Sequence, residues 1–473
     1  MRRYLNFIGN EFFEGGDGLI DVGDPATGRL TAQVAAASRD QALRAATMAA
    51  QAQQAWAQLP GAARGEALHR LADALERDAQ RIGEALAAES GKSLADAAAE
   101  VRYGAEITRY HAEWGRRLEG EVIPSDSPDE NLILLRAPIG VAVCLIPFNF
   151  PVYTLLRKIA PALIAGNAVV ARPSNHTPCS ALELAATVQS AGLPAGLINI
   201  LAMRHETAAA LCEHPQVGMI TLTGSVEAGR KVLGYAQANI AKTSLELGGK
   251  TPAIVEADAD LVRAADDIAA SALNHCGQVC TSVERVYAHA SVYQPLSSLL
   301  TERFHARRWG NRSRHPDAMG PLASEAARQR VHAMVERALA EGAVLAAGGI
   351  VPEGEGWFYP PTLLLECRQE MEIVREEVFG PVLCLLRHED AEQALALAND
   401  HQFGLSSVLY TENYRTALRF ANRIEAGELY INRTPADPYQ GYHAGWKRSG
   451  LGGDDGKHGM LEFTQTRLVV MKH

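Results

Sequence analysis

The sequence predicts an α/β protein built on helix-covered parallel sheets. Between residues 132 and 224, short apolar strands alternate with helical segments in units of about 30 residues. A second series of strand and helix starts with "TPAIVE" (251–256) and continues in 322–350 and 390–430. Strands that alternate with helices are typical of parallel sheets covered by helices.

The region 34–118 precedes these units and is alanine-rich. Ser38 and Gln41 have the spacing of a capping box, and apolar residues recur three and four apart in 67–90. A Ser-Gly-Lys break at 90–92 separates this pattern from another helix. We interpret the region as scaffold.

Composition limits the partners of the chain. The 473 residues carry a formal net charge of -10, whereas proteins that bind nucleic acids or anionic membranes usually have basic patches. The N-terminus lacks the apolar core of a signal peptide, and the most apolar run, 141–156, is too short to span a membrane. We expect a soluble, cytoplasmic protein that binds neither nucleic acid nor membrane.

The seven cysteines are odd in number and irregularly spaced, which is not a disulfide framework and suits a reducing compartment. Cys276 and Cys280 stand four apart, but no nearby Cys or His pair complements them, so we predict no metal site. Cys280 is a candidate nucleophile and Cys276 a small apolar neighbour. The alternative for Cys280 is a buried structural cysteine.

Two glycine-containing segments suggest turns. The strand "GMITLTGS" (218–225) runs into a small-residue turn before a helix, where free N–H groups and the helix dipole can bind an anion. The spacing of Gly224 and Gly229 does not match GxGxxG, so an ordinary βα turn is the alternative. No predicted strand leads into the glycine-rich segment "SGLGGDDG" (449–456), and we expect a flexible loop there.

Glu246 and Asn149 are candidates for acid–base and electrostatic chemistry. Glu246 ends an apolar strand, where burial would raise its pKa as a general base requires; a salt-bridged glutamate is the alternative. Asn149 lies between two prolines in "IPFNFP", where its amide can donate to a developing oxyanion. A turn asparagine that bonds its own backbone is the alternative.

Seven motifs, in order along the chain, resemble those of the aldehyde dehydrogenase superfamily. They are "PFNFP" (147–151), "PALIAGNAVVARPS" (161–174), "TGS" (223–225), "LELGGK" (245–250), "GQVC" (277–280), "EEVFGPV" (376–382) and "GWKRSGLGG" (445–453). The match runs essentially end to end. Within the superfamily, the stretches 112–126 and 430–459 look most like bacterial lactaldehyde/glycolaldehyde dehydrogenases.

The resemblance implies three parts of the fold and an oligomer. A Rossmann-like cofactor domain would cover 1–116 and 139–249, and an α/β catalytic domain would cover 250–448. A small β oligomerisation flap would combine 117–138 with 449–473. Because family members are dimers or tetramers, we expect a homodimer or homotetramer.

The resemblance also implies a mechanism. The Cys280 thiolate attacks the aldehyde, Asn149 and the Cys280 N–H hold the oxyanion, and hydride passes to the nicotinamide. Glu246 then activates the water that hydrolyses the thioester, and Lys158 matches a family lysine linked to proton relay. The implied cofactor-binding residues are Ile146, Pro147, Phe148, Arg172, Ser174, Asn175, Gly224, Ser225, Gly229, Glu246, Leu247, Gly248, Glu377 and Phe379.

One departure from the family pattern concerns the adenosine end of the cofactor. The usual lysine-Pro-Ser-glutamate reads Arg172-Pro173-Ser174-Asn175 here. The family glutamate would repel a 2′-phosphate; Asn175 removes that charge, and Arg172 suits phosphate. The alternative is that Asn175 still bonds a ribose hydroxyl and favours NAD+, so we expect NAD(P)+.

The resemblance places five polar residues around the substrate: Asn149, Arg157, Thr281, Tyr442 and His443. Polar donors there favour a short hydroxylated aldehyde such as lactaldehyde or glycolaldehyde. In the alternative, Arg157 is tied to a protein carboxylate; if it bound a substrate carboxylate instead, succinate semialdehyde would fit. A cysteine hydrolase or acyltransferase would also use Cys280, but it would need a histidine base and no nucleotide fold.

Overall fold

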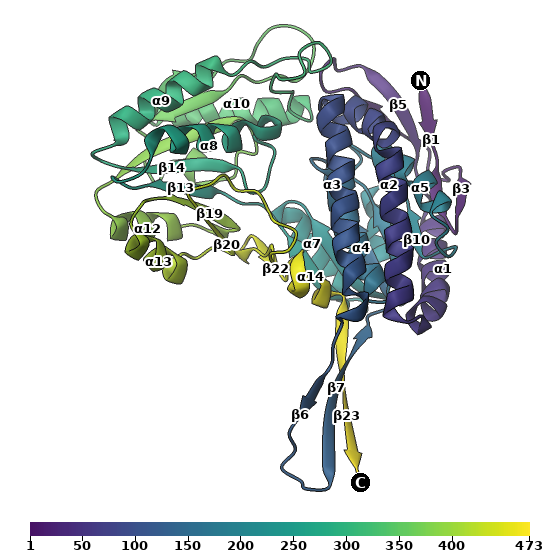
Figure 1. Ribbon diagram of the computed structural model, residues 1–473. Coiled ribbons are helices and arrows are strands. Elements are labelled where there is room, and N and C mark those ends of the chain that lie inside the picture. Colours follow the sequence, from purple (N-terminus) through teal and green to yellow (C-terminus); the bar gives the residue numbers. More distant parts are fainter.

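Two sheets, joined directly by the segment 247–250, organise the molecule. The computed structural model describes residues 1–473 and places the sheets in two neighbouring lobes (Figure 1). The first sheet has the strand order β22-β12-β11-β8-β9-β10-β2-β3, and the second has the order β15-β16-β17-β14-β13-β19-β20. The α/β architecture expected from the alternation of strands and helices is therefore confirmed.

The parallel strands of the first sheet follow the predicted βα rhythm. They are β8 (Val141–Leu145), β9 (Ala168–Arg172), β10 (Ile198–Ile200), β11 (Val217–Thr223) and β12 (Lys242–Glu246). The chain proceeds outward from β8 to β10 on one side and from β11 to β12 on the other. The strand order thus reverses between β8 and β11, and ligands of doubly wound sheets bind outside the carboxyl ends at such a point.

The remaining elements of the first lobe extend this sheet at its edges or pack around it. Its helices are α1 (Arg39–Gln58), α2 (Gly61–Ser90), α3 (Leu94–Ala112), α4 (Pro151–Ile164), α5 (Cys179–Ser190), α6 (His205–Cys212), α7 (Val226–Ala236) and α14 (Gly456–Glu462). Its other strands are β1 (Arg2–Tyr4), β2 (Asn6–Ile8), β3 (Glu11–Phe13), β4 (Leu19–Gly23), β5 (Leu30–Ala35) and β22 (Gly450–Leu451). The predicted capping box is confirmed, because the Ser38 and Gln41 side chains each accept the other residue's backbone N–H.

The second lobe contains the other sheet and its helices. Its strands are β13 (Thr251–Val255), β14 (Val283–His289), β15 (Val344–Ala347), β16 (Thr362–Leu365), β17 (Val382–His388), β19 (Ser406–Tyr410) and β20 (Glu428–Ile431), with a separate pair β18 (Phe403–Gly404) and β21 (Trp446–Lys447). Its helices are α8 (Leu261–Leu273), α9 (Tyr293–Ala306), α10 (Glu325–Ala340), α11 (Glu372–Arg375), α12 (Ala391–Asn399) and α13 (Tyr414–Arg423). Each lobe has its own apolar core.

A three-stranded antiparallel sheet projects from the first lobe (Figure 1). It consists of β6 (Glu121–Ile123), β7 (Glu130–Pro138) and β23 (Thr464–Lys472). The sequence assigns all of 449–473 to this flap, whereas β22 pairs with β12, and Met460 and Phe463 lie in the core of the first lobe. None of the helices combines the length and apolarity that crossing a membrane requires.

Candidate active site

The candidate site lies where the two sheets meet. Glu246 ends β12, and the chain enters β13 at Thr251, which pairs with Val283 of β14. Cys280, just before β14, is therefore brought close to the end of β12. A Cβ on Gly249 would lie 2.4 Å from the Cys280 carbonyl oxygen, so glycine is what permits this approach.

A strained turn delivers Cys280 from helix α8. His275, Cys276 and Gly277 have φ values of 45°, 59° and 69°, all in the left-handed region. A Cβ on Gly277 would meet the Gly380 carbonyl oxygen at 2.1 Å. Cys276 is packed in the core of the second lobe, and Cys280 alone among the seven free cysteines is not fully buried.

His443 connects the general-base candidate to further carboxylates. Its Nε2 lies 3.3 Å from Oε2 of Glu246, and its Nδ1 lies 2.9 Å from Oε1 of Glu428 and 3.5 Å from Oδ2 of Asp437. Burial favours a neutral imidazole, but Asp437, Glu428 and Glu246 together raise the pKa of His443 well above its ordinary value. The ligand atoms of His443, Glu428 and Asp437 all lie within 4.8 Å of one another, a spacing that a metal ion could use.

Burial governs the titration of the two reactive candidates. Neither carboxylate oxygen of Glu246 has a hydrogen bond within the protein, and burial raises its pKa to about 8 against the opposing effect of His443. Burial also raises the pKa of the Cys280 thiol, and the neighbouring His443 again opposes the shift. A carboxylate with a pKa near working pH is suited to general-base chemistry.

Helix α4 supplies two buried cations. Lys158 Nζ donates to Oγ1 of Thr221 and to Oδ2 of Asp454, both at 2.8 Å. Arg157 bonds Asp455, and its guanidinium also lies 3.8 Å from Asp437 and from Asp454. Arg157 is therefore tied to protein carboxylates, the second of the two arrangements considered from the sequence.

The segment 449–456, predicted to be a flexible loop, is ordered and lies against this site, so that prediction is wrong. Gly450 pairs with Glu246 across β22 and β12, and Asp454 exchanges two backbone hydrogen bonds with His443. Asp454 and Asp455 are both 1% exposed. Asp454, Asp455 and Glu428 are site residues that were not predicted from the sequence. The only available signal was the pair of adjacent aspartates in "SGLGGDDG" (449–456).

The candidate oxyanion donors lie beside the nucleophile. Asn149 is buried, and its Nδ2 donates to the carbonyl oxygen of Gln278 at 2.9 Å, which leaves one N–H of the amide unused. The backbone N–H of Cys280 has no partner within the protein. Thr281 is buried next to them, and the Tyr442 hydroxyl lies 3.4 Å from Oε1 of Glu462.

The expected cofactor-binding residues follow the carboxyl edge of the first sheet. Ser225 caps α7 by accepting the Ala228 N–H at 3.2 Å, and Gly229 leaves no room for a Cβ against Leu247. The predicted strand, turn and helix are thus present. The others end or follow β8 (Ile146, Pro147, Phe148), β9 (Arg172, its last residue, then Ser174 and Asn175), β11 (Gly224) and β12 (Leu247, Gly248).

This edge fits a dinucleotide by its unpaired polar atoms and its shape. Arg172 Nε, Asn175 Oδ1 and Thr223 Oγ1 are buried without a partner in the protein. From the second lobe, Oε1 of Glu377 accepts the Gly249 N–H at 3.0 Å, and the Phe379 ring lies 5.9 Å from that of Phe148. A doubly wound sheet beside a thiol and a buried carboxylate is compatible with a dinucleotide-dependent oxidoreductase that uses a cysteine.

Comparison with known proteins gives the family. Residues 12–469 match the model of the aldehyde dehydrogenase family. Lactaldehyde dehydrogenase of Escherichia coli (strain K12) is 43% identical over 459 residues, which cover 97% of this chain and 96% of that protein. A crystal structure of lactaldehyde dehydrogenase from Escherichia coli matches with a TM-score of 0.98 and 41% identity, and each chain is covered completely.

A further relative is the D-glyceraldehyde dehydrogenase (NADP(+)) of Thermoplasma acidophilum, 34% identical over 460 residues, or 96% of this chain and 93% of that protein. The chain belongs to the aldehyde dehydrogenase family, as its motifs predict, and is an NAD(P)-dependent oxidoreductase. The expected family architecture is confirmed by the same structural match.

Proposed function

We propose that this protein oxidises short hydroxylated aldehydes, of the lactaldehyde and glycolaldehyde type, to carboxylic acids. The observation that carries the proposal is the buried His443, held between Glu246, Glu428 and Asp437 beside Cys280. A substrate hydroxyl can hydrogen-bond to the Glu246 carboxylate, whose oxygens have no hydrogen bond within the protein, whereas a plain aliphatic aldehyde leaves them without one at a cost. Two relatives named for hydroxyaldehydes, lactaldehyde and D-glyceraldehyde, support this substrate class.

The side chains of the site have successive roles in the proposed reaction. The Cys280 sulfur bonds to the carbonyl carbon, and the Asn149 amide and the Cys280 N–H hold the resulting oxyanion. The bound NAD(P)+ supplies a hydride acceptor, so that a thioester remains on Cys280. Glu246 takes a proton from water, whose oxygen attacks the thioester and releases the acid and the thiol.

Succinate semialdehyde is the second candidate substrate, because an arginine could bind its carboxylate. Arg157 is poorly available for this role, since it already bonds Asp455 and has Asp437 and Asp454 within 3.8 Å. An additional carboxylate would have to compete with these three aspartates for the guanidinium. A cysteine hydrolase is also disfavoured, because the charged His443 cannot act as its neutral base.

We infer that the site accepts NADP+ as well as NAD+. Arg172 has an unpartnered Nε, and Asn175 brings no negative charge to the place where an adenosine ribose would lie. Asp21 and Asp24 line a hollow of about 270 Å³ together with Asn175, and their charge favours the cofactor without a 2′-phosphate. The NADP(+)-named relative supports acceptance of the phosphate.

We also propose that the flap mediates assembly into a homodimer or homotetramer. Its strands leave large apolar side chains in solvent, including Val122, Leu135, Leu468 and Val470. A projecting sheet with exposed apolar side chains on its strands is a typical contact surface.

The function is tested by incubating the purified protein with glycolaldehyde or (S)-lactaldehyde and either cofactor. We expect equimolar carboxylic acid and NAD(P)H, because the reaction consumes one aldehyde, one NAD(P)+ and one water for each acid formed. Ester hydrolysis without any NAD(P)H formation would instead indicate the cysteine hydrolase.

A further inference from the structure

We propose that Glu284 is a positioning residue that holds the segment Glu377–Phe379, and thereby the nicotinamide end of the cofactor, in place. The inference rests on the proposed function, because Glu377 and Phe379 are assigned to the cofactor by resemblance. Glu284 itself lies in β14, away from the carboxyl edge of the first sheet that would bind the dinucleotide.

Both carboxylate oxygens of Glu284 are used on successive backbone groups of that segment. Oε2 accepts the Val378 N–H and Oε1 accepts the Phe379 N–H, each at 2.8 Å. Glu284 is 2% exposed, so no water competes strongly for these bonds. Hydrogen bonds from N–H groups to a charged acceptor are about twice as strong as neutral ones.

Lys250 forms a buried ion pair with Glu284. Its side chain is fully buried, and Nζ donates to Oε2 of Glu284 at 2.6 Å. Lys250 directly follows Gly249, whose N–H donates to Glu377. The pair therefore couples the loop after β12 to the loop that carries Phe379, and removing either charge would leave the other buried and unpaired.

Phe379 needs such support because its backbone is strained. Its φ is +51°, a left-handed value that costs energy for a residue with a large side chain. This residue receives one of the two Glu284 bonds, and its ring faces Phe148 on the cofactor edge. The strain persists because the surrounding contacts over-determine the conformation.

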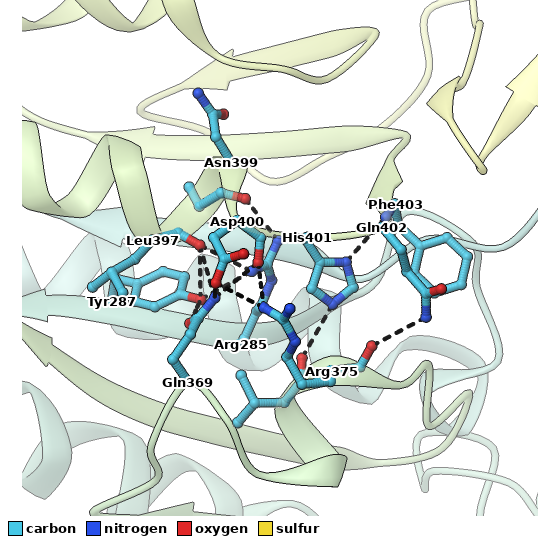
Figure 2. Close-up of polar contacts among 12 residues, drawn as sticks. Arg285, Tyr287, Gln369, Arg375, Leu397, Asn399, Asp400, His401, Gln402 and Phe403 are labelled. Carbon is cyan, nitrogen blue, oxygen red and sulfur yellow. Dashed lines mark hydrogen bonds and ion pairs between the residues drawn. The ribbon is translucent and has the colours of Figure 1, made fainter.

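The residues just before Glu377 are held separately, by the segment 397–403 (Figure 2). Arg375 donates to the carbonyl oxygen of Asp400 at 2.6 Å, and His401 Nε2 lies 3.3 Å from the carbonyl oxygen of Val374. Burial lowers the pKa of His401 to about 2, so it is neutral and Nε2 carries the donated proton. These contacts do not reach Val378 and Phe379. There Arg330 donates to the carbonyl oxygens of Glu377 and Val378 at 3.3 and 2.7 Å, and Glu284 alone accepts the N–H groups of Val378 and Phe379.

The chain offers a matched control in a second buried lysine–glutamate pair. Lys92 Nζ bonds Glu100 and also donates to the Asn149 carbonyl oxygen at 2.6 Å. Oε1 of Glu100 accepts the N–H groups of Val152 and Tyr153 at 3.0 and 3.2 Å. This pair has the same chemistry as Lys250–Glu284, but it holds the oxyanion side of the site.

The test compares Glu284→Gln with Glu100→Gln in the full-length enzyme. Glutamine keeps the shape but removes the charge and one acceptor, so for Glu284→Gln we expect KM and Kd for NAD(P)+ to rise about 10- to 100-fold. Cofactor-free hydrolysis of p-nitrophenyl acetate should stay within about threefold. Glu100→Gln should lower ester hydrolysis and aldehyde oxidation together.

Equal losses of both activities in Glu284→Gln, or an unchanged Kd for the cofactor, would overturn the inference. If the unpaired Lys250 prevents folding of that variant, the double variant Glu284→Gln/Lys250→Met removes the unpaired charge. It should likewise show weaker cofactor binding with nearly unchanged ester hydrolysis. Cofactor titration of the wild type needs no aldehyde, so a wrong substrate class would not affect this result. Wild-type protein that binds neither NAD+ nor NADP+ would contradict the proposed function itself.

Discussion

The Nε2 atom of His443 lies 3.3 Å from Oε2 of Glu246, and both side chains are only 3% exposed. Burial alone raises the pKa of Glu246 and so favours its protonated form, whereas the charge on His443 lowers this pKa and favours the ionised carboxylate. The basicity of Glu246 is therefore set by a competition between its surroundings and one imidazolium. In the proposed mechanism, His443 would therefore affect hydrolysis of the thioester as well as recognition of the substrate.

The first prediction concerns pH. Glu246 acts as a base only when deprotonated, so the deacylation rate should rise with pH through its pKa of about 8. His443→Asn removes the cation that lowers this pKa, and the midpoint should move upward by about one pH unit. The measurement is the steady-state rate of ester hydrolysis, after the acylation burst, as a function of pH. An unmoved midpoint would show that His443 does not act on Glu246.

The second prediction concerns the nucleophile. Cys280→Ala should lower aldehyde oxidation by at least about 1,000-fold, because no other group can form the thioester. The melting temperature should change little, since Cys280 is partly exposed. Cys276→Ala, a change in the buried neighbour, is the matched control and should keep kcat within a few-fold. Equal activity losses in the two variants would contradict the assignment of Cys280, rather than Cys276, as the nucleophile.

The third prediction concerns the oxyanion. Asn149→Ala should lower kcat by about 100- to 1,000-fold, as removal of one oxyanion donor does in other acyl-transfer sites. Asn149→Asp has the same shape but a negative charge and should be at least as slow. A variant whose KM rises while kcat is unchanged would place Asn149 in substrate binding only.

The fourth prediction concerns cofactor choice. Asn175→Glu introduces a charge next to the expected 2′-phosphate, so kcat/KM for NADP+ should fall at least about 10-fold relative to that for NAD+. Asn175→Gln keeps the residue neutral and should leave the ratio within a few-fold. If the wild type already shows a large NAD+ preference, the inferred use of NADP+ is incorrect.

The fifth prediction concerns assembly. Leu468→Asp with Val470→Asp places two charges on exposed apolar positions of β23 and should shift the proposed dimer or tetramer toward monomer. Light scattering coupled to size-exclusion chromatography gives the mass directly. Leu418→Asp, an exposed position on α13, serves as the control and should leave the mass unchanged. A flap variant with the wild-type mass would refute a role for these residues.

Local patterns in the sequence were sufficient where the structure is decided locally. The capping box of Ser38 and Gln41, the strand Ala168–Arg172 and the turn capped by Ser225 all depend on neighbours a few residues away. The alternation of strands and helices also predicted the sheets. The cofactor-binding residues that follow these strands, by contrast, were assigned through the resemblance to the aldehyde dehydrogenase family.

The charges around the site could not be predicted in this way. Asp455 and Asp454 bond Arg157 and Lys158 across 298 and 296 residues of sequence, and the two-residue strand β22 gives too little pattern to detect. Read alone, two aspartates among glycines indicate a solvated loop. The role of Glu284 was hidden for the same reason, since its partners are Lys250 and backbone groups of a distant loop.

The central claim is that a polar, carboxylate-rich site selects short hydroxylated aldehydes. The most direct test is kcat/KM for (S)-lactaldehyde, glycolaldehyde, propanal and succinate semialdehyde, measured in parallel with saturating cofactor. We predict that lactaldehyde or glycolaldehyde exceeds propanal by at least about 100-fold, because propanal leaves the buried polar groups unpaired. Equal values for propanal, or a best value for succinate semialdehyde, would contradict the proposed specificity.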